Sequence, residues 1–362
     1  MTSKITINLT DSRKVKPKEE SLAFGRHFTD HMFITDYVKG IGWQNSRIVP
    51  YAPITLDPAA IVFHYGQTVF EGLKAYRAKD NSIRLFRPEE NFKRLNRSLD
   101  RLCMPQIDEI DALESLLELL KVEQDWVPTL EGTSLYIRPF VIATEAFLGV
   151  APATTYQFYI ILSPVGSYYE EGIHPIKILV ENEFVRAVKG GTGSAKTAGN
   201  YASALKAQET ASAQGYSQVM WLDGIERKYI EEVGSMNIFF KIDGEVITPE
   251  INGSILEGIT RKSIIELLAH WGTPVTERKV SMEELALAHA SGKLEEVFGT
   301  GTAAVISPVG ELNWNGTIMN VNEGITGELS KKLYDTLTKI QLGDETDSLN
   351  WVTELSSSYV NM

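Results

Sequence analysis

Short apolar runs and longer periodic segments alternate along the chain, and they predict its secondary structure. In the first half, runs rich in β-branched and aromatic residues and bounded by turn residues indicate strands. These runs cover 59–65, 82–86, 133–142 and 156–164. Hydrophobic residues at helical spacing predict a helix from about Pro88 to Leu102, with proline in its first turn, and another near 111–126. The first half is therefore an α+β region.

The second half begins after VGSYYEEGIHP (165–175), which mixes glycine, proline, acidic and aromatic residues. Beyond this stretch, strands are expected at 176–181, 217–222 and 237–242, and helices at about 198–214, 259–271 and 323–341. Gly272 is a typical C-cap for the helix ending near Trp271. We predict an N-terminal domain (1–165) that starts with a polar, partly mobile arm (1–21), a linker (166–175) and a C-terminal domain (176–362).

The charge balance and the cysteine count narrow the possible partners and compartments. The chain has 362 residues and a formal net charge of −12, so it lacks the basic excess that a nucleic-acid backbone requires. The N-terminus has no apolar core of signal-peptide length, and no run reaches the roughly 18 apolar residues of a membrane span. Cys103, the single cysteine, cannot form an internal disulfide and is expected in the core. We expect a cytoplasmic protein with no nucleic-acid or membrane partner.

Metal binding has weak support. His27 and His31 form an H-x-x-x-H pair, but HFTDH lacks the glutamate of the metalloprotease motif and no third ligand is evident. Packing or surface placement is therefore the favoured interpretation, and no metal is expected.

The segment GGTGSAKTAGNYASAL (190–205) is the strongest candidate for chemistry, and two mechanisms could use it. A phosphate-binding P-loop would explain Gly190 and the Lys196-Thr197 pair, but Ala195 stands where the last glycine is required. Alternatively, Lys196 is a Schiff-base lysine, whose amine condenses with the aldehyde of a cofactor that stabilises a carbanion. Such a cofactor also needs a phosphate anchor, a carboxylate for its ring nitrogen and a donor near its phenolic oxygen.

The sequence offers candidates for these additional roles. Glu231 and Glu232 precede the glycine turn at Gly234, and strand alternation places them on opposite faces, so only one can point inward. Either carboxylate could pair with a ring nitrogen, or both could be solvated. A helix opening at 258–260 and the Gly/Thr loop 299–303 could bind phosphate, and both could also be ordinary turns.

Taken together, several segments resemble the branched-chain aminotransferases, a family of pyridoxal-phosphate enzymes of fold type IV. They occur in the family's order, within a match that runs from about Phe24 to the end of the chain. The segments are FEGLKAY (70–76), FRPEENFKRLNRSLDRL (86–102), GTSLYIRP (132–139), AKTAGNYASAL (195–205), EEVGSMNIFF (231–240) and EVFGTGTA (296–303).

The resemblance implies an α/β (α+β) fold with a small α+β N-terminal domain and a larger, mixed β-barrel-like and α C-terminal domain. It implies pyridoxal 5'-phosphate as cofactor, bound to Lys196, with Tyr201 at its phenolic oxygen and Glu232, rather than Glu231, at its ring nitrogen. The remaining cofactor-binding residues implied are Arg94, Arg186, Ser235, Ile259, Thr260 and Thr302.

The resemblance also implies amino transfer between leucine, isoleucine or valine and 2-oxoglutarate in a homodimer whose partner subunit completes the site. The implied substrate-binding residues are Phe24, Tyr65, Phe70, Tyr136, Arg138, Tyr168 and Ala303. Ala304 and Ser307 stand where mammalian members carry a Cys-x-x-Cys pair, which excludes a thiol switch there. Rival hypotheses are a D-amino-acid aminotransferase, an aminodeoxychorismate lyase, a P-loop NTPase and a non-catalytic binding protein.

Overall fold

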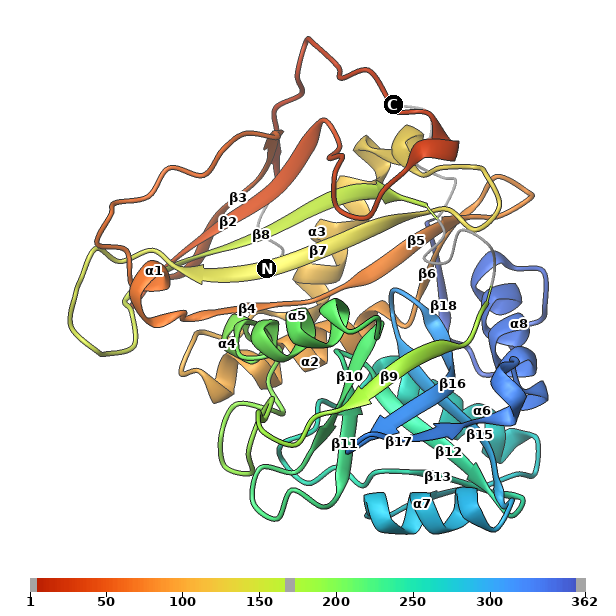
Figure 1. Ribbon diagram of the computed structural model, residues 1–362. Helices are drawn as coiled ribbons and strands as arrows, with labels where there is room; N and C mark the ends of the chain where they lie inside the picture. The colour runs from red at the N-terminus through yellow and green to blue at the C-terminus, as the bar shows by residue number, and fades with distance from the viewer. Residues whose placement is uncertain (1–4, 167–172, 356–362) are drawn as a thin grey trace. The chain divides into compact units, whose positions relative to one another are not determined.

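A computed structural model describes residues 5–166 and 173–355 of the chain, and the contacts divide it into two compact units (Figure 1). Unit 1 contains the described residues of 1–170, 195–198 and 339–362, and unit 2 those of 171–194 and 199–338. The short segment 195–198 therefore packs with unit 1, although the chain on either side of it belongs to unit 2. This segment includes Lys196.

Unit 1 is built on a nine-stranded sheet in the order β1-β3-β2-β8-β7-β5-β6-β18, with β4 paired to β7. The strands are β1 (Thr6–Ile7), β2 (His31–Val38), β3 (Gly42–Pro50), β4 (Thr68–Phe70), β5 (Leu73–Arg77), β6 (Ile83–Phe86), β7 (Ser134–Ala143), β8 (Thr155–Val165) and β18 (Val352–Leu355). The helices are α1 (Ile61–Tyr65), α2 (Pro88–Arg101) and α3 (Glu109–Val122), and the 3-10 turns are η1 (Glu19–Ser21) and η2 (Gln124–Trp126).

The main core of unit 1 lies between its sheet and helices α2 and α3. Phe92, Leu95 and Leu99 form the buried stripe of α2, with Leu116 and Leu120 of α3 in the same cluster. A second, smaller cluster contains Met32 and Ile34 of β2, Ile142 of β7 and Tyr159 of β8, with partly buried neighbours. The sheet therefore carries apolar side chains in two separate clusters.

Unit 2 has a second nine-stranded sheet, in the order β11-β10-β9-β16-β15-β12-β13-β14, with β17 paired to β16. Its strands are β9 (Ile176–Val180), β10 (Gln218–Leu222), β11 (Ile230–Val233), β12 (Asn237–Ile242), β13 (Glu245–Thr248), β14 (Val275–Glu277), β15 (Leu294–Gly301), β16 (Val305–Trp314) and β17 (Thr317–Asn320). Its helices are α4 (Ala198–Ala202), α5 (Leu205–Ala213), α6 (Ile259–His270) and α7 (Met282–Ala290), with the turn η3 (Asn322–Gly324). Helix α8 (Glu328–Leu342) leads to the C-terminal part of unit 1.

The mixed α/β class predicted from the sequence is confirmed, as are most of the strands and helices that the sequence predicted. Residues 59–65 are an exception, because Ile61–Tyr65 is a single helical turn ended by Gly66 in the left-handed conformation (φ 58°). A short apolar run does not distinguish a strand from a turn of helix, and only Ile61 of this turn is buried. The expected helix over 198–214 is divided into α4 and α5. Strands β1 to β5 and β13 to β18 and helix α7 were not predicted.

The N-terminal arm has contacts that the sequence did not indicate, and Cys103 differs from expectation. Thr6–Ile7 pairs in parallel with β3, and the backbone N–H of Lys14 donates to Asp30 at 2.7 Å, so the described part of the arm is tied to unit 1. Cys103 is exposed just after α2, with a positive φ of 54°, because the chain turns out of the helix there. In the described parts of the chain, each helix is too short or too polar for a membrane span.

Candidate active site

The main chain of Lys196 is held by two elements of unit 1. Its backbone N–H donates to the Ser98 hydroxyl of α2 at 2.9 Å, and its carbonyl accepts from the N–H of Phe70 in β4 at 3.0 Å. The Thr197 hydroxyl donates to the carbonyl of Thr68 at 2.8 Å. These contacts fix the direction in which the lysine side chain leaves the backbone.

An aromatic and cationic cluster surrounds this lysine within unit 1. The Lys196 Nζ lies 5.0 Å from the centre of the Phe70 ring, and the Arg138 Cζ lies 4.9 Å from the same ring. The guanidinium of Arg138 donates to the Tyr136 hydroxyl at 3.1 Å, and the Tyr136 ring contacts Phe24 edge-on at 4.8 Å. The structure thus brings five of the predicted residues together in one unit.

Two details show how this cluster is built. A Cβ at Gly72 would overlap the Tyr136 hydroxyl, so the glycine of FEGLKAY makes room for that side chain. Among the described residues, the buried Nε of Arg138 has no hydrogen-bond partner. A buried cationic donor without an acceptor is costly, and an anionic ligand would satisfy it.

Of the other predicted substrate-binding residues, Tyr65 is not part of this cluster and Ala303 lies in unit 2. The Tyr65 hydroxyl donates to the carbonyl of Leu148 in the loop between β7 and β8, and Tyr65 is 43% exposed. Tyr168 lies outside the described residues. Tyr65 therefore does not join Phe70 and Arg138 within this chain's unit 1.

Arg94 is buried in a hydrogen-bonded ion pair rather than solvated on the helix surface. Its Nε and Nη2 donate to the two carboxylate oxygens of Glu71 at 2.7 and 2.8 Å. The Asn91 amide donates to the same carboxylate at 2.8 Å. Desolvation alone would raise the pKa of Glu71, but the charge and hydrogen bonds of Arg94, the charge of Lys196 and the Asn91 bond together lower it. The carboxylate therefore stays ionised and holds the guanidinium.

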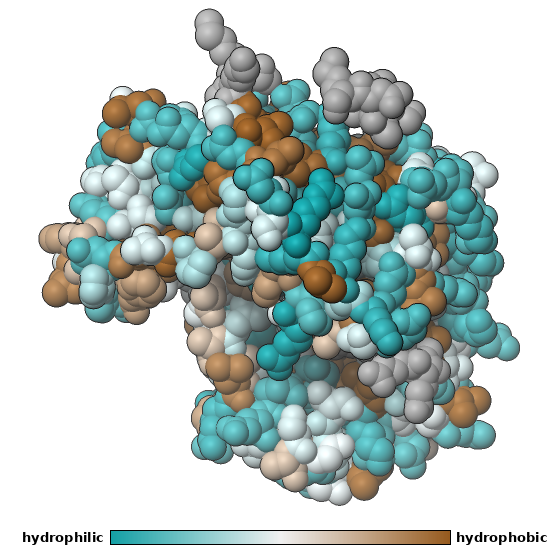
Figure 2. Space-filling model, turned by 90° about the horizontal axis from the view of Figure 1, so that it is seen from above, coloured by the Kyte–Doolittle hydropathy of each residue, from teal (hydrophilic) through white to brown (hydrophobic). Residues whose placement is uncertain are grey.

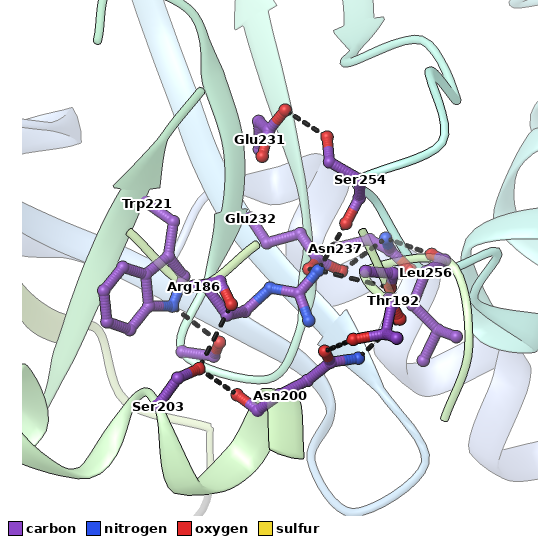
Figure 3. Close-up of polar contacts among 12 residues, drawn as sticks. Arg186, Thr192, Asn200, Ser203, Trp221, Glu231, Glu232, Asn237, Ser254 and Leu256 are labelled. Carbon is purple, nitrogen blue, oxygen red and sulfur yellow. Dashed lines mark hydrogen bonds and ion pairs between the residues drawn. The ribbon is translucent and has the colours of Figure 1, made fainter. Parts of the chain in front are cut away.

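Glu232 is the centre of a polar network in unit 2 (Figure 3). Its carboxylate forms an ion pair with Arg186 and accepts from the amide of Asn237 at 3.3 Å. The same amide donates to the carbonyl of Leu256 at 2.9 Å, just before α6. Glu231 and Glu232 are both buried, with 4% and 3% exposure, and Figure 3 shows Glu231 directed to Ser254 and Glu232 to Arg186. The possibility that both are solvated is wrong.

The glycine-rich loop is fixed to α4 by side chains that the sequence did not single out. Thr192 donates to the Asn200 side-chain oxygen at 2.7 Å, and the Asn200 amide donates back to the Thr192 carbonyl at 2.8 Å. The Ser203 hydroxyl donates to the carbonyl of Arg186 at 3.1 Å. These bonds set the loop that leads from Arg186 toward the lysine segment.

The helix α6 begins at a glycine and has no capping side chain. Gly258 is its N-cap, whereas α3 and α7 are capped by Asp108 and Ser281. A Cβ at Gly258 would overlap the Asn237 side-chain oxygen, which is why glycine is required there. The first N–H groups of α6 therefore have no capping side chain, as an anion-binding helix start requires.

The other predicted residues of unit 2 lie in turns and helix starts. Tyr201 is half-buried in α4, Ser235 is exposed in the turn before β12, and Ile259 is buried. Thr260, Thr302 and Ala303 are half-buried. Close to the last two, Thr300 is buried, and in the described structure its hydroxyl has no hydrogen-bond partner.

Several residues around these groups were missed by sequence reasoning. Glu71, Ser98 and Asn237 are buried, and the residues next to a polar side chain in sequence do not show what it contacts in the fold. Lys74 lies opposite Tyr136 in the pairing of β5 and β7, and burial lowers its pKa to about 8. Glu71 and Lys74 lie within the FEGLKAY motif, which was the available signal.

The described residues fit pyridoxal 5'-phosphate. The cofactor needs an amine for its aldehyde, donors for its phosphate and a carboxylate for its ring nitrogen. Groups of those three types occur in the two units, with Lys196 and Arg94 in unit 1 and the start of α6 and the buried Glu232 in unit 2. Two buried donors without partners in the described structure, the Arg138 Nε and the Thr300 hydroxyl, are further atoms that a ligand could satisfy.

The histidine pair has a structural environment. His31 is buried against the carboxylate of Glu123, and its other ring nitrogen accepts from the backbone N–H of Thr10 at 2.8 Å, whereas His27 is exposed. In the described part of the chain, no group of three or more His, Cys, Asp or Glu side chains is arranged to hold a metal ion.

Comparison with known proteins gives a family match and close relatives. The model of the family "Amino-transferase class IV" matches residues 68–312. The "Branched-chain-amino-acid aminotransferase 2" of Bacillus subtilis (strain 168) is 64% identical over 353 residues, which are 98% of this chain and 97% of that protein. The identity therefore extends through both units.

Solved structures support the same relationship. The branched-chain amino acid aminotransferase of Escherichia coli is 27% identical with a TM-score of 0.74, covering 90% of this chain and 99% of its own. The T.th. branched-chain amino acid aminotransferase complexed with N-(5'-phosphopyridoxyl)-L-glutamate is 25% identical with a TM-score of 0.72, covering 89% of this chain and 98% of its own.

Proposed function

The chain belongs to the class IV aminotransferases and is a branched-chain amino acid aminotransferase, and from that premise we propose how its residues perform the reaction. It transfers the amino group of L-leucine, L-isoleucine or L-valine to 2-oxoglutarate, with pyridoxal 5'-phosphate as cofactor. The T.th. relative was solved with a phosphopyridoxyl-glutamate conjugate, which supports both the cofactor and glutamate as the second amino acid.

One observation carries this assignment. The amine of Lys196 and the guanidinium of Arg138 contact the same Phe70 ring, and the Arg138 Nε has no partner in the described structure. A base and a carboxylate-binding cation thus lie beside an apolar surface. This combination suits a substrate that has an α-amino acid head and either an apolar or an acidic side chain.

The residues that hold the cofactor have distinct roles. Lys196 binds its aldehyde, Tyr201 its phenolic oxygen and Glu232 its ring nitrogen, with Arg186 holding the Glu232 carboxylate. The phosphate is bound by Arg94, Ser235, Ile259, Thr260 and Thr302. When bound, the cofactor supplies a positively charged ring that stabilises negative charge at the substrate's α-carbon.

The protein moves the proton and positions the substrate. The Nζ of Lys196, which lies beside the Phe70 ring, would be the base that takes the α-proton of the substrate and the acid that gives it back. Phe24 and Phe70, with Ala303, enclose the branched side chain, while Arg138 and Tyr136 bind the second carboxylate of glutamate. Tyr168 and the partner subunit's Tyr65 complete the substrate pocket. One pocket thus accepts two unlike substrates in turn, which gives ping-pong kinetics.

We propose a homodimer in the cytoplasm. The exposed apolar residues of unit 1 include Phe63, Tyr65, Phe147, Leu148 and Val150. Figure 2 shows apolar residues at the left edge of the drawn face, where Figure 1 places α1 and the loop between β7 and β8. Because Tyr65 does not reach this chain's own Arg138 cluster, we assign it to the pocket of the partner subunit.

Leu148→Asp should produce monomers in light scattering, and unchanged dimers would refute this surface.

The proposed function is tested by trapping the lysine. The wild-type holoenzyme should be yellow, and borohydride should reduce the carbon–nitrogen bond to the cofactor and leave it attached to the peptide that contains Lys196. Lys196→Ala should lose this labelling and all turnover, whereas Lys189→Ala, an exposed lysine before the glycine-rich loop, should keep both. Labelling in Lys196→Ala at the wild-type level would refute the assignment.

Substrate assays separate the rival enzymes of the same fold. L-leucine with 2-oxoglutarate should be converted, and D-alanine and the aminodeoxychorismate substrate should not. Glu232→Gln should lower kcat because the amide does not hold a proton on the ring nitrogen. A preference for D-alanine would replace the branched-chain assignment and leave the roles of Lys196 and Glu232 in place.

A further inference from the structure

Glu231, the neighbour of the ring-nitrogen acid, is buried without a role in the mechanism. It lies in β11, and strand alternation directs its side chain away from that of Glu232. It lines a cavity in unit 2 together with Lys189, Tyr229 and Lys279, and the residue is only 4% exposed. A buried carboxylate is costly unless it is hydrogen-bonded, so its partners indicate its purpose.

Two hydrogen-bond partners of Glu231 belong to the loop before α6. The Ser254 hydroxyl donates to one Glu231 carboxylate oxygen, and the Asn252 amide donates to the same oxygen at 3.1 Å. The backbone N–H of Ser254 donates to the Asn252 side-chain oxygen at 3.0 Å. Glu231 therefore fixes the position of the loop at Ser254.

The carbonyl of Ser254 faces the guanidinium that holds Glu232. It accepts from the Nη2 of Arg186 at 2.6 Å, and the same Nη2 contacts the Glu232 carboxylate. A Cβ at Gly193 would overlap this carbonyl oxygen, so the glycine-rich loop closes against it. Figure 3 shows these groups in sequence, with Ser254 between Glu231 and Arg186.

We propose that Glu231 is a positioning residue for the acid on the cofactor ring, acting through Ser254 and Arg186. The proposal rests on the proposed function, because it gives Glu232 its role at the ring nitrogen. Glu231 holds the Ser254 hydroxyl, Ser254 presents its carbonyl to Arg186, and Arg186 is thereby held in the direction of Glu232. The two adjacent carboxylates thus have different roles. Glu232 binds the cofactor ring, and Glu231 holds Glu232 in place through Ser254 and Arg186.

This positioning role depends on hydrogen-bond acceptance and not on negative charge. A glutamine at position 231 keeps an oxygen that accepts from Ser254 and Asn252, whereas an alanine removes it. If Glu231 acted through its charge, glutamine and alanine would be equally harmful. The conservative variant therefore separates the two explanations.

The test compares Glu231→Ala, Glu231→Gln, Ser254→Ala and the Glu231→Ala/Ser254→Ala double variant as holoenzymes. The measurements are kcat and KM for L-leucine, and the Kd of pyridoxal 5'-phosphate from tryptophan fluorescence. Both alanine variants should lower kcat by about tenfold, with KM within about twofold, because the misplaced acid acts on the proton step. Cofactor Kd should rise by a similar factor, and Glu231→Gln should remain near wild type.

The double variant and a charge control complete the test. If the two residues act in series, the double variant should be no worse than either single variant, because both changes break the same contact. Glu250→Gln removes a carboxylate that lines the same cavity and is exposed, and it should leave kcat and cofactor Kd unchanged. Ser254→Ala removes only a hydroxyl, so it keeps the test valid if Glu231→Ala does not fold.

Three results would overturn the proposal: unchanged kcat and cofactor Kd in Ser254→Ala, equal losses in the glutamine and alanine variants, or additive losses in the double variant. Failure of the proposed function would look different. A wild-type protein that binds the cofactor but does not convert L-leucine would refute that function, while the cofactor Kd series would still test the chain of contacts.

Discussion

Each unit contains a buried carboxylate–guanidinium pair, and the two pairs differ in which member is held. In unit 1, the Glu71 carboxylate accepts from Arg94, Asn91 and the backbone N–H of Gly72, so the acid is surrounded by donors of its own unit. In unit 2, the Nη2 of Arg186 contacts Glu232 and the carbonyls of Ser254 and Gly193, so the base is surrounded by acceptors. In unit 1 the fixed Glu71 carboxylate therefore holds the Arg94 cation. In unit 2 the fixed Arg186 guanidinium holds the Glu232 anion.

This difference agrees with the proposed roles of the two pairs. A phosphate requires a fixed cation, and Glu71 fixes Arg94 without leaving its own charge exposed. A protonated ring nitrogen requires a fixed anion, and Arg186 fixes Glu232. Breaking each pair should consequently have a different main effect, on folding in unit 1 and on catalysis in unit 2.

The largest effect is expected from Glu71→Ala. It would leave the Arg94 guanidinium, which is 4% exposed, without its bidentate partner. Removing one member of a buried ion pair typically costs about 3–5 kcal/mol of unfolding free energy. Urea unfolding followed by circular dichroism measures the loss. Glu114→Ala, an exposed acid of α3, is the control, and a change below about 0.5 kcal/mol is expected for it. Equal losses of unfolding free energy in Glu71→Ala and Glu114→Ala would contradict a stabilising role for the Glu71–Arg94 pair.

The pH dependence of stability tests whether Glu71 is ionised in the folded protein. The pKa of Glu71 is lowered from its ordinary value of 4.5, so the folded state binds its proton less readily than the unfolded state does. The stability from this ionised carboxylate is present above pH 4.5 and is lost as the pH falls through the lowered pKa. The gap in unfolding free energy between wild type and Glu71→Gln should therefore shrink on acidification. A gap that stays constant with pH would contradict an ionised Glu71.

Arg186→Lys should act mainly on turnover. A lysine ammonium is a point charge that does not reproduce the planar guanidinium fixed between Glu232 and the Ser254 carbonyl. We expect kcat to fall about 10- to 100-fold, with a smaller change in KM for L-leucine. Steady-state kinetics and urea unfolding on the same samples measure both effects. Arg278→Lys, which alters the partly exposed pair with Glu284, is the control and should keep wild-type kcat. If Arg186→Lys lost as much stability as Glu71→Ala, the pair in unit 2 would also serve mainly folding, and the proposed difference between the units would be wrong.

Gly258→Ala should disturb the link between the carboxylate network and the helix start. Its Cβ would overlap the Asn237 side-chain oxygen, and Asn237 bonds both Glu232 and the carbonyl of Leu256. Overpacking at this point should cost about 1–2 kcal/mol of stability and weaken cofactor binding. Gly199→Ala is the matched control, because nothing lies within 4 Å of a Cβ at Gly199. Denaturant titration and fluorescence-measured cofactor Kd give the two values, and an unaffected Kd in Gly258→Ala would contradict the link.

Local patterns in the sequence were sufficient for much of the secondary structure but not for the ion pairs. Helix α2 was predictable because Pro88 suits a first turn and Phe92, Leu95 and Leu99 recur at helical spacing. Strand alternation also predicted that Glu231 and Glu232 point to opposite faces. These are properties of neighbouring residues, which a sequence displays directly.

The burial of charged residues depends on partners that are distant in sequence. Arg94 lies off the apolar stripe of α2, so it suggested a solvated side chain, yet its partner Glu71 is 23 positions away. His31 has its carboxylate partner Glu123 92 positions away, which explains why the H-x-x-x-H spacing was uninformative. Such pairings follow from sheet order and helix packing, which no local pattern encodes. The family motifs identified Arg94 and Glu232 but not the residues that hold them.

The smallest effect is expected at the start of α3, which is capped by a side chain of its own. The Asp108 carboxylate caps α3 by accepting from the N–H groups of Ile110 and Asp111 at 2.9 and 3.0 Å, whereas α6 begins at Gly258 without a capping side chain. Asp108→Ala should cost about 1 kcal/mol of unfolding free energy. Because α3 has no proposed role in catalysis, kcat and cofactor Kd should not change.

Asp111→Ala is the control for this helix, because it removes a first-turn charge but keeps the cap. It should cost only about 0.3 kcal/mol through the helix dipole. Urea unfolding of both variants, with kcat and cofactor Kd measured on the same preparations, completes the comparison. A loss of cofactor affinity in Asp108→Ala would mean that α3 also supports the site. The contrast between a helix start closed by its own side chain and one left for a ligand would then have to be abandoned.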